Sequence, residues 1–131
     1  MKVLLDTHVW LWSLSEPGRL SREARRILAS RRNAVHLSAV SAWEIAIKVA
    51  VGKLDLPEPP GSYVPTRMAR QGLIPLVVTH AHALAVATLP LHHRDPFDRL
   101  LVAQSLVERL PLLTADPAFA PYGIEIIEAA G

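Results

Sequence analysis

The 131-residue chain has no cysteine, which excludes disulfides, iron–sulfur clusters, thiolate zinc sites and cysteine nucleophiles. It also lacks an apolar run of the roughly 20 residues that a membrane-spanning helix needs. The excess of one sign of charge is small as well, because 14 Lys and Arg against 12 Asp and Glu leave a formal net charge of only +2. That excess is too small to indicate nucleic-acid binding by itself.

The composition indicates a compact protein. Half of them are hydrophobic and the mean hydropathy is +0.24, which excludes a disordered chain. The length suits one domain, residues 1–131, and Met1-Lys2-Val3 leads directly into an apolar run. We therefore expect a single soluble, cytoplasmic domain without a signal peptide.

Short apolar runs alternate with helical patterns along the chain. Buried strands are expected at 2–6, 35–37, 74–78, 111–114 and 124–127. Helices are expected at 7–14, 21–31, 38–51, 63–70, 79–88 and 96–109, with Ser21, Thr79 and Asp95 at three of their starts and Gly52 as a stop. This alternation predicts an α/β fold, a parallel sheet with helices on both faces. Ligands of such sheets bind beyond the carboxyl ends of the strands.

Four acidic residues are expected at that edge. Asp6 follows the first strand, and Asp116 lies two residues beyond Thr114, at the end of another. Glu44 lies early in the helix after the second strand. Asp98 lies in the first turn of a later helix, on the same face as Leu101, Val102 and Ser105.

Each acid also has a structural interpretation. Asp6 and Asp116 are both placed to cap a helix, and Glu44 is spaced to form a capping box with Ser41 or an ion pair with Lys48. Asp95, directly before Pro96, is expected to be a cap. Asp98 lies on an inward helical face, where a carboxylate needs a partner or a cation, so we interpret it as catalytic.

Considered together, the acids indicate a metal site. Carboxylates gathered in one place repel one another and take up protons unless a cation neutralises them, and the chain has few lysines to do so. Oxygen ligands suit Mg²⁺ or Mn²⁺, which activate water and stabilise charge on phosphoryl oxygens. We therefore predict phosphodiester hydrolysis, with Asp6, Asp98 and Asp116 as metal ligands, Glu44 in support, and the hydroxyls of Thr7 and Thr114 orienting water or phosphate.

The motifs that contain these acids resemble a known family. They are Leu4–Trp10, Ser38–Lys48, Gly52–Leu54, Asp95–Gln104 and Leu113–Asp116. Together they resemble a PIN domain, and more narrowly the VapC-type ribonuclease toxins of toxin–antitoxin pairs, from Lys2 to about Phe119. The resemblance implies a three-layer α/β/α sandwich and an endoribonuclease dependent on Mg²⁺ or Mn²⁺. It maps the catalytic acids onto Asp6, Glu44, Asp98 and Asp116, with Thr114 as a polar helper, and implies a homodimer and a small antitoxin partner.

Basic residues and histidines are harder to interpret. Six arginines lie between residues 19 and 32, and Arg22, Arg25 and Arg26 share a helical face that either contacts RNA, faces solvent or binds the antitoxin. His80 and His82 are spaced badly for a shared metal. His92 and His93 are interpreted as a surface pair in a loop, with a zinc or substrate contact as the alternative.

Other functions fit less well. A phosphoacceptor receiver domain needs a lysine after a late strand, and none follows Lys53. A haloacid-dehalogenase-type phosphatase needs an aspartate where His8 stands. The remaining alternative is a catalytically silent PIN-like module that holds a partner protein or RNA.

Overall fold

The computed structural model describes all residues from Met1 to Gly131. Its five strands are β1 (Lys2–Leu5), β2 (Ala34–Ser38), β3 (Ile74–Leu76), β4 (Leu112–Thr114) and β5 (Ile126–Glu128). They form one parallel sheet in the order β3-β2-β1-β4-β5. Strand β1 lies at the centre, and the chain adds strands on one side of it before it crosses to the other. The carboxyl end of β1 is therefore the point at which ligands are expected to bind.

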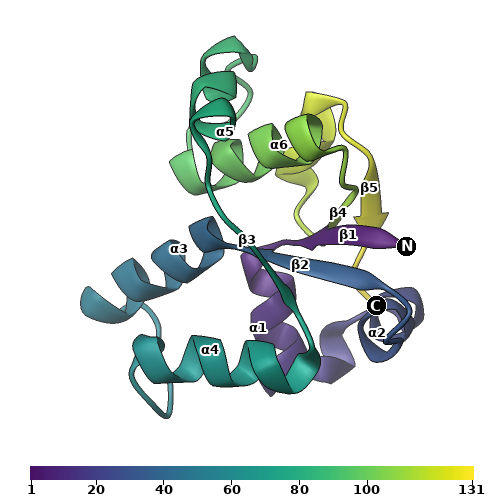
Figure 1. The fold of residues 1–131 in the computed structure, drawn as a ribbon, viewed down its shortest axis with the longest axis vertical. Coiled ribbons are helices and arrows are strands. Elements are labelled where there is room, and N and C mark those ends of the chain that lie inside the picture. The colour runs from purple at the N-terminus through teal and green to yellow at the C-terminus, as the bar shows by residue number, and fades with distance from the viewer.

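Helices cover both faces of this sheet. They are α1 (Thr7–Ser15), α2 (Arg22–Ala29), α3 (Ala39–Ala50), α4 (Pro60–Gln71), α5 (His80–Ala85) and α6 (Pro96–Glu108), with 3-10 turns η1 (Pro17–Arg19), η2 (Val86–Thr88) and η3 (Pro117–Tyr122). In Figure 1, α5 and α6 lie above the sheet, and α1, α2 and α4 lie below it. The predicted three-layer α/β/α fold is confirmed. No helix has both the length and the apolar character needed to cross a bilayer.

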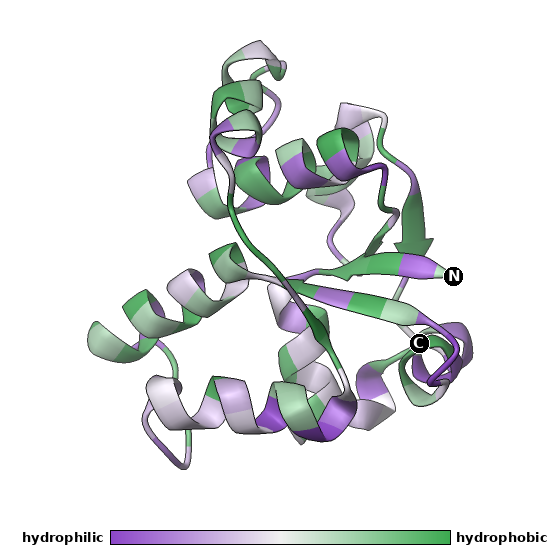
Figure 2. Ribbon diagram, in the orientation of Figure 1, coloured by the Kyte–Doolittle hydropathy of each residue, from purple (hydrophilic) through white to green (hydrophobic).

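The core is divided by the sheet into two clusters. Val3 and Leu5 of β1 pack in one cluster with Trp10 of α1, whereas Leu4 packs in the other with Leu101 of α6. This alternation follows from the two-residue period of a strand. Figure 2 shows the central strands mostly in the green of apolar residues, as strands buried on both faces should be.

The predicted boundaries differ from the structure mainly at segment ends. Helix α2 stops at Ala29, and α4 begins at Pro60 rather than Tyr63 because proline is favoured in the first turn. The helix that Thr79 caps gives way to η2 after Ala85, and β3 is shorter than expected. The helix start indicated by Asp116 is that of the 3-10 turn η3.

Candidate functional site: a carboxylate cluster at the edge of the sheet

Asp6 occupies the N-cap position of α1 but does not cap it. Its side chain makes no hydrogen bond to the first turn of the helix, although the residue is only 3% exposed. One carboxylate oxygen, Oδ2, accepts a 2.8 Å hydrogen bond from the hydroxyl of Thr114 instead. The capping interpretation of Asp6 is therefore wrong.

Ionisation of Asp6 is unfavourable in this environment. Burial raises the pKa of its carboxyl group, the Thr114 hydrogen bond and the nearby His8 oppose that rise, and the charges of Glu44 and Asp116 add to it. The influence of Glu44 and Asp116 on Asp6 also places these three acids within electrostatic reach of one another. A bound cation would oppose the rise in the pKa of Asp6.

Asp98 is the second strongly perturbed acid. Its side chain, in the first turn of α6, is 14% exposed, and its Oδ2 lies 2.8 Å from Nε2 of His93. Burial, followed by the charge of Asp95, raises the pKa of Asp98 to about 6, and Asp6 and Glu44 contribute to the rise despite the opposing hydrogen bond of His93. Asp98 thus lies within electrostatic reach of Asp6 and Glu44.

Glu44 lies on α3 and is 2% exposed. Its Oε2 accepts a 2.6 Å hydrogen bond from Nζ of Lys48, so the predicted ion pair is present. The capping box with Ser41 is not, because α3 begins after Ser38, whose side chain accepts from the amide of Val40. Glu44 therefore pairs with Lys48, and its negative charge also acts on Asp6 and Asp98.

Two further aspartates do act as caps. Oδ1 of Asp95 accepts hydrogen bonds from the amides of Phe97 and Asp98, at 2.8 and 3.1 Å, which confirms its predicted role. Oδ1 of Asp116 accepts one from the amide of Ala118 at 2.9 Å, at the start of η3. The remaining oxygen of Asp116 is free of hydrogen bonds within the chain.

The two threonines differ. Thr114 joins two of the acids, because its hydroxyl donates to Asp6 and accepts from the backbone amide of Asp116 at 3.0 Å. The hydroxyl of Thr7, predicted to orient water or phosphate, instead donates to the hydroxyl of Ser41 at 2.7 Å and bonds to none of the acids.

The sequence favoured a surface position for His93 over a zinc or substrate contact, and the structure places its Nε2 2.8 Å from Oδ2 of Asp98. One ligand atom each from His93, Asp95 and Asp98 lies within 4.8 Å of the other two. The loop that carries His93 is held by Arg99, whose guanidinium donates to the carbonyls of Pro90 and Val86 at 2.9 and 3.2 Å. His93 lies five residues before Asp98, and the contact depends on the conformation of the loop that joins them.

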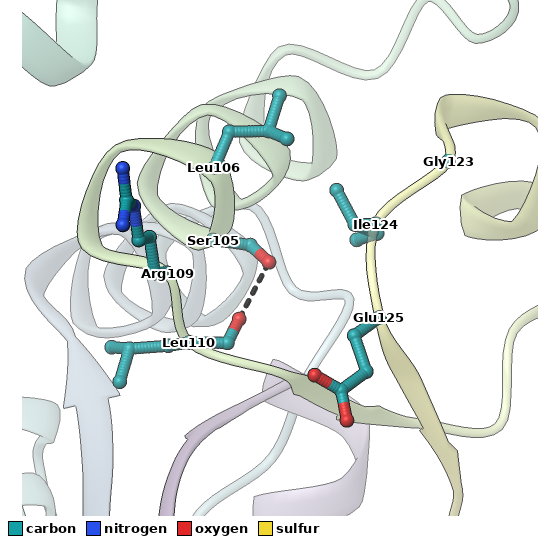
Figure 3. A pocket seen from close by; sticks show the side chains of 7 residues that line it. All are labelled: Ser105, Leu106, Arg109, Leu110, Gly123, Ile124 and Glu125. Atoms are coloured by element: carbon teal, nitrogen blue, oxygen red, sulfur yellow. Dashed lines mark hydrogen bonds between the residues drawn. The ribbon is translucent and has the colours of Figure 1, made fainter.

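The carboxylates have access to solvent. Asp6 and Asp116 line a cavity of about 260 Å³, together with His8, Trp12, Ala115 and Pro117. Another cavity, at the far end of α6, contains Arg109 and Glu125 but none of the predicted site residues. Figure 3 shows this cavity, in which the hydroxyl of Ser105 donates to the carbonyl of Leu110. Because none of the predicted acids lines it, it lies apart from the candidate site.

The arginine face lies elsewhere. Arg22, Arg25 and Arg26 are exposed on α2, which Figure 1 shows beside the amino ends of the strands and the chain termini. The structure does not bring them to the carboxylate edge, and their contact with RNA stays a prediction.

The ligand types fit a hard divalent cation. Asp6, Asp98 and Asp116 offer carboxylate oxygens, and two of these acids have raised pKa values that a bound cation would lower. The ligand atoms that lie close enough together to share one ion are those of His93, Asp95 and Asp98. Binding of a metal by Asp6, Asp98 and Asp116 together stays a prediction.

Known proteins resemble this chain in sequence and fold. Residues 3–124 match the PIN domain family. Ribonuclease VapC22 of Mycobacterium tuberculosis is 31% identical over 87% of this chain and 86% of its own length. Ribonuclease VapC16 of the same organism is 58% identical over 46% of this chain, a match that spans 43% of that protein.

Solved structures agree on the fold. VapBC2 from Rickettsia felis, bound to a DNA fragment from its promoter, aligns with a TM-score of 0.74 at 14% identity, over 98% of this chain and 99% of that one. A toxin–antitoxin complex from Klebsiella pneumoniae aligns with a TM-score of 0.62 at 20% identity, over 95% and 96%. The chain therefore belongs to the PIN domain family, in the group that contains the VapC ribonucleases.

Proposed function

We propose that this protein is a metal-dependent endoribonuclease that acts as the toxin of a toxin–antitoxin pair in the cytoplasm. The observation that carries the proposal is Asp6, which is buried at a helix start without capping it and whose pKa is raised beside Glu44 and Asp116. Burial of an ionised carboxylate costs stability, and a bound cation would offset that cost. The relatives named as VapC ribonucleases support the same activity.

In this proposal Asp6, Asp98 and Asp116 hold Mg²⁺ or Mn²⁺, and Glu44 supports the site by its negative charge. A bound divalent cation lowers the pKa of water and neutralises charge on a phosphoryl oxygen. The protein supplies the geometry: Thr114 fixes one oxygen of Asp6, and His93 holds one oxygen of Asp98. Both carboxylates are thus oriented before substrate arrives.

The proposed partners are an RNA substrate, a small cognate antitoxin and a second copy of this chain. The structural similarity to a toxin–antitoxin complex supports the antitoxin partner. The homodimer follows from the family resemblance.

The proposal is tested by incubating total RNA with the protein and Mg²⁺, Mn²⁺ or EDTA, and mapping the cut sites. We expect discrete cleavage with either metal and none in EDTA. An Asp6→Asn variant, which keeps the shape of the side chain and loses its charge, should fold and fail to cleave. Absence of cleavage under every condition, combined with tight binding of the protein encoded by the adjacent gene, would instead establish a catalytically silent binding module.

A further inference from the structure

A second cavity adjoins the carboxylate cluster and has the opposite charge. It measures about 410 Å³ and lies between α1, α3 and the turn that follows α3. Lys48 and Lys53 line it, although the whole chain contains only one other lysine, Lys2. The remaining lining residues are Thr7, His8, Leu11, Ile45 and Leu54.

The turn after α3 places the two lysines together. Gly52 adopts a left-handed conformation, with φ of 76°, which glycine allows without strain. The amides of Lys53 and Leu54 then donate to the carbonyl of Lys48, at 2.8 and 3.2 Å. The chain thereby folds back over the end of α3, and Lys53 comes to line the same cavity as Lys48.

The two ammonium groups are differently engaged. Lys48 is 33% exposed and donates to Glu44, which leaves its other N–H groups free. Lys53 is exposed and forms no ion pair with any acid of the chain. The cavity therefore retains positive charge that the protein itself does not neutralise.

His8 connects this basic cavity to the acidic one. It lines both the cavity of Lys48 and Lys53 and the cavity of Asp6 and Asp116. A flexible polyanion bound across His8 would place one anionic group near the acids and another near the lysines. Single-stranded RNA carries such anionic groups at regular intervals along one chain.

We propose that the cavity lined by Lys48 and Lys53 binds a backbone phosphate of the RNA strand, next to the phosphate that is cleaved at the carboxylates. The inference rests on the proposed ribonuclease function and adds a substrate-binding subsite to it. A lysine ammonium group suits this role as a mobile point charge that accepts any phosphate orientation and reads no base. The subsite thus positions the strand and does not select its sequence.

The test compares Lys53→Gln with Lys2→Gln, two variants with the same loss of charge. Lys2 is exposed at the amino end of β1, whereas the carboxylates follow the carboxyl end of the sheet (Figure 1). Binding of a fluorescently labelled single-stranded RNA is measured by anisotropy in EDTA, across a salt series, so that cleavage does not interfere. Cleavage kinetics are then measured with Mn²⁺.

We expect Lys53→Gln to raise Kd about 5-fold and to reduce the salt slope, log Kd against log salt, by about 0.7, the value for one lost single-strand phosphate contact. KM should rise by a similar factor with kcat little changed, and Lys53→Arg should restore both. Lys2→Gln should leave Kd within about 2-fold of the wild type, since surface charges distant from the strand are screened.

Two results would overturn the subsite alone. If wild-type protein cleaves RNA while Lys53→Gln and Lys2→Gln behave alike, the subsite is wrong and the ribonuclease function stands. The subsite is also wrong if Lys53→Gln weakens only the binding of the antitoxin, because the cavity then holds a protein carboxylate. If the wild type neither binds nor cleaves RNA, the ribonuclease function fails and the subsite fails with it.

Discussion

The first turns of α1 and α6 both follow an aspartate, and the two aspartates behave differently. Asp95 accepts hydrogen bonds from two amides of α6, whereas Asp6 leaves the amides of α1 without a side-chain partner and turns to Thr114. Both residues occupy the position where a cap is favourable. The difference teaches that the cap position alone does not decide what an aspartate binds, and it leaves Asp6 available for the cation that we propose.

The largest difference between the two aspartates should appear in the rate of RNA cleavage. Asp6→Asn should lower the rate of RNA cleavage about 100-fold or more, because a neutral amide cannot replace a carboxylate ligand of a divalent cation. Asp95→Asn should change the rate by no more than a few-fold, since asparagine is an equally good cap. Initial rates with Mn²⁺ measure both, and equal losses in the two variants would abolish the distinction.

A smaller effect is expected on stability, through Asp98. Its pKa of about 6 lies above the ordinary value, so the folded state binds a proton more tightly than the unfolded state does. The metal-free protein should therefore lose stability as the pH rises from about 4 through 6, by about 1–2 kcal/mol once solvent screening is allowed for.

Asp98→Asn removes this ionisation, so it should be more stable than the wild type at pH 8 in EDTA and no more stable than it below pH 4. Denaturant unfolding at the two pH values provides the measurement. A variant that is less stable than the wild type at pH 8 would show that the Asp98 carboxylate stabilises the fold.

The smallest expected effect is the difference in the free energy of unfolding between alanine variants of Asp95 and Asp6. Asp95→Ala should lower the free energy of unfolding by about 1 kcal/mol, as the loss of an N-cap usually does. Asp6→Ala removes no cap and relieves the burial of an acid, so it should not destabilise α1 in the same way. Urea unfolding in EDTA distinguishes them, and a matching loss in Asp6→Ala would mean that its hydrogen bond with Thr114 stabilises as much as a cap.

The sequence predicted the edge of the sheet at which Asp6 and Asp116 lie, because both residues follow short apolar runs that are typical of buried strands. It could not decide what each carboxylate binds. The difference between Asp6 and Asp95 arises from the packing of β4 beside β1, which brings Thr114 to Asp6 across 108 positions of the sequence.

Contacts made by loops and turns were the least predictable. His93 reaches Asp98 only because Arg99 holds its loop, and Lys53 reaches the cavity of Lys48 only because Gly52 reverses the chain. His82, expected only to be a poor metal ligand, is 1% exposed and lies 2.8 Å from Glu108. Only the pair of His82 and Glu108 depends on packing between two helices, whereas the other two contacts depend on the conformations of a loop and a turn.

The central claim is that Asp6, and not Asp95, is held ready for a divalent cation. Calorimetric titration of Mn²⁺ into the wild type, Asp6→Asn and Asp95→Asn at pH 7.5 tests it most directly. We predict that the wild type and Asp95→Asn bind Mn²⁺ with similar affinity, and that Asp6→Asn loses at least about 10-fold, or 1.4 kcal/mol, of that affinity. Undiminished Mn²⁺ binding by Asp6→Asn would contradict the claim.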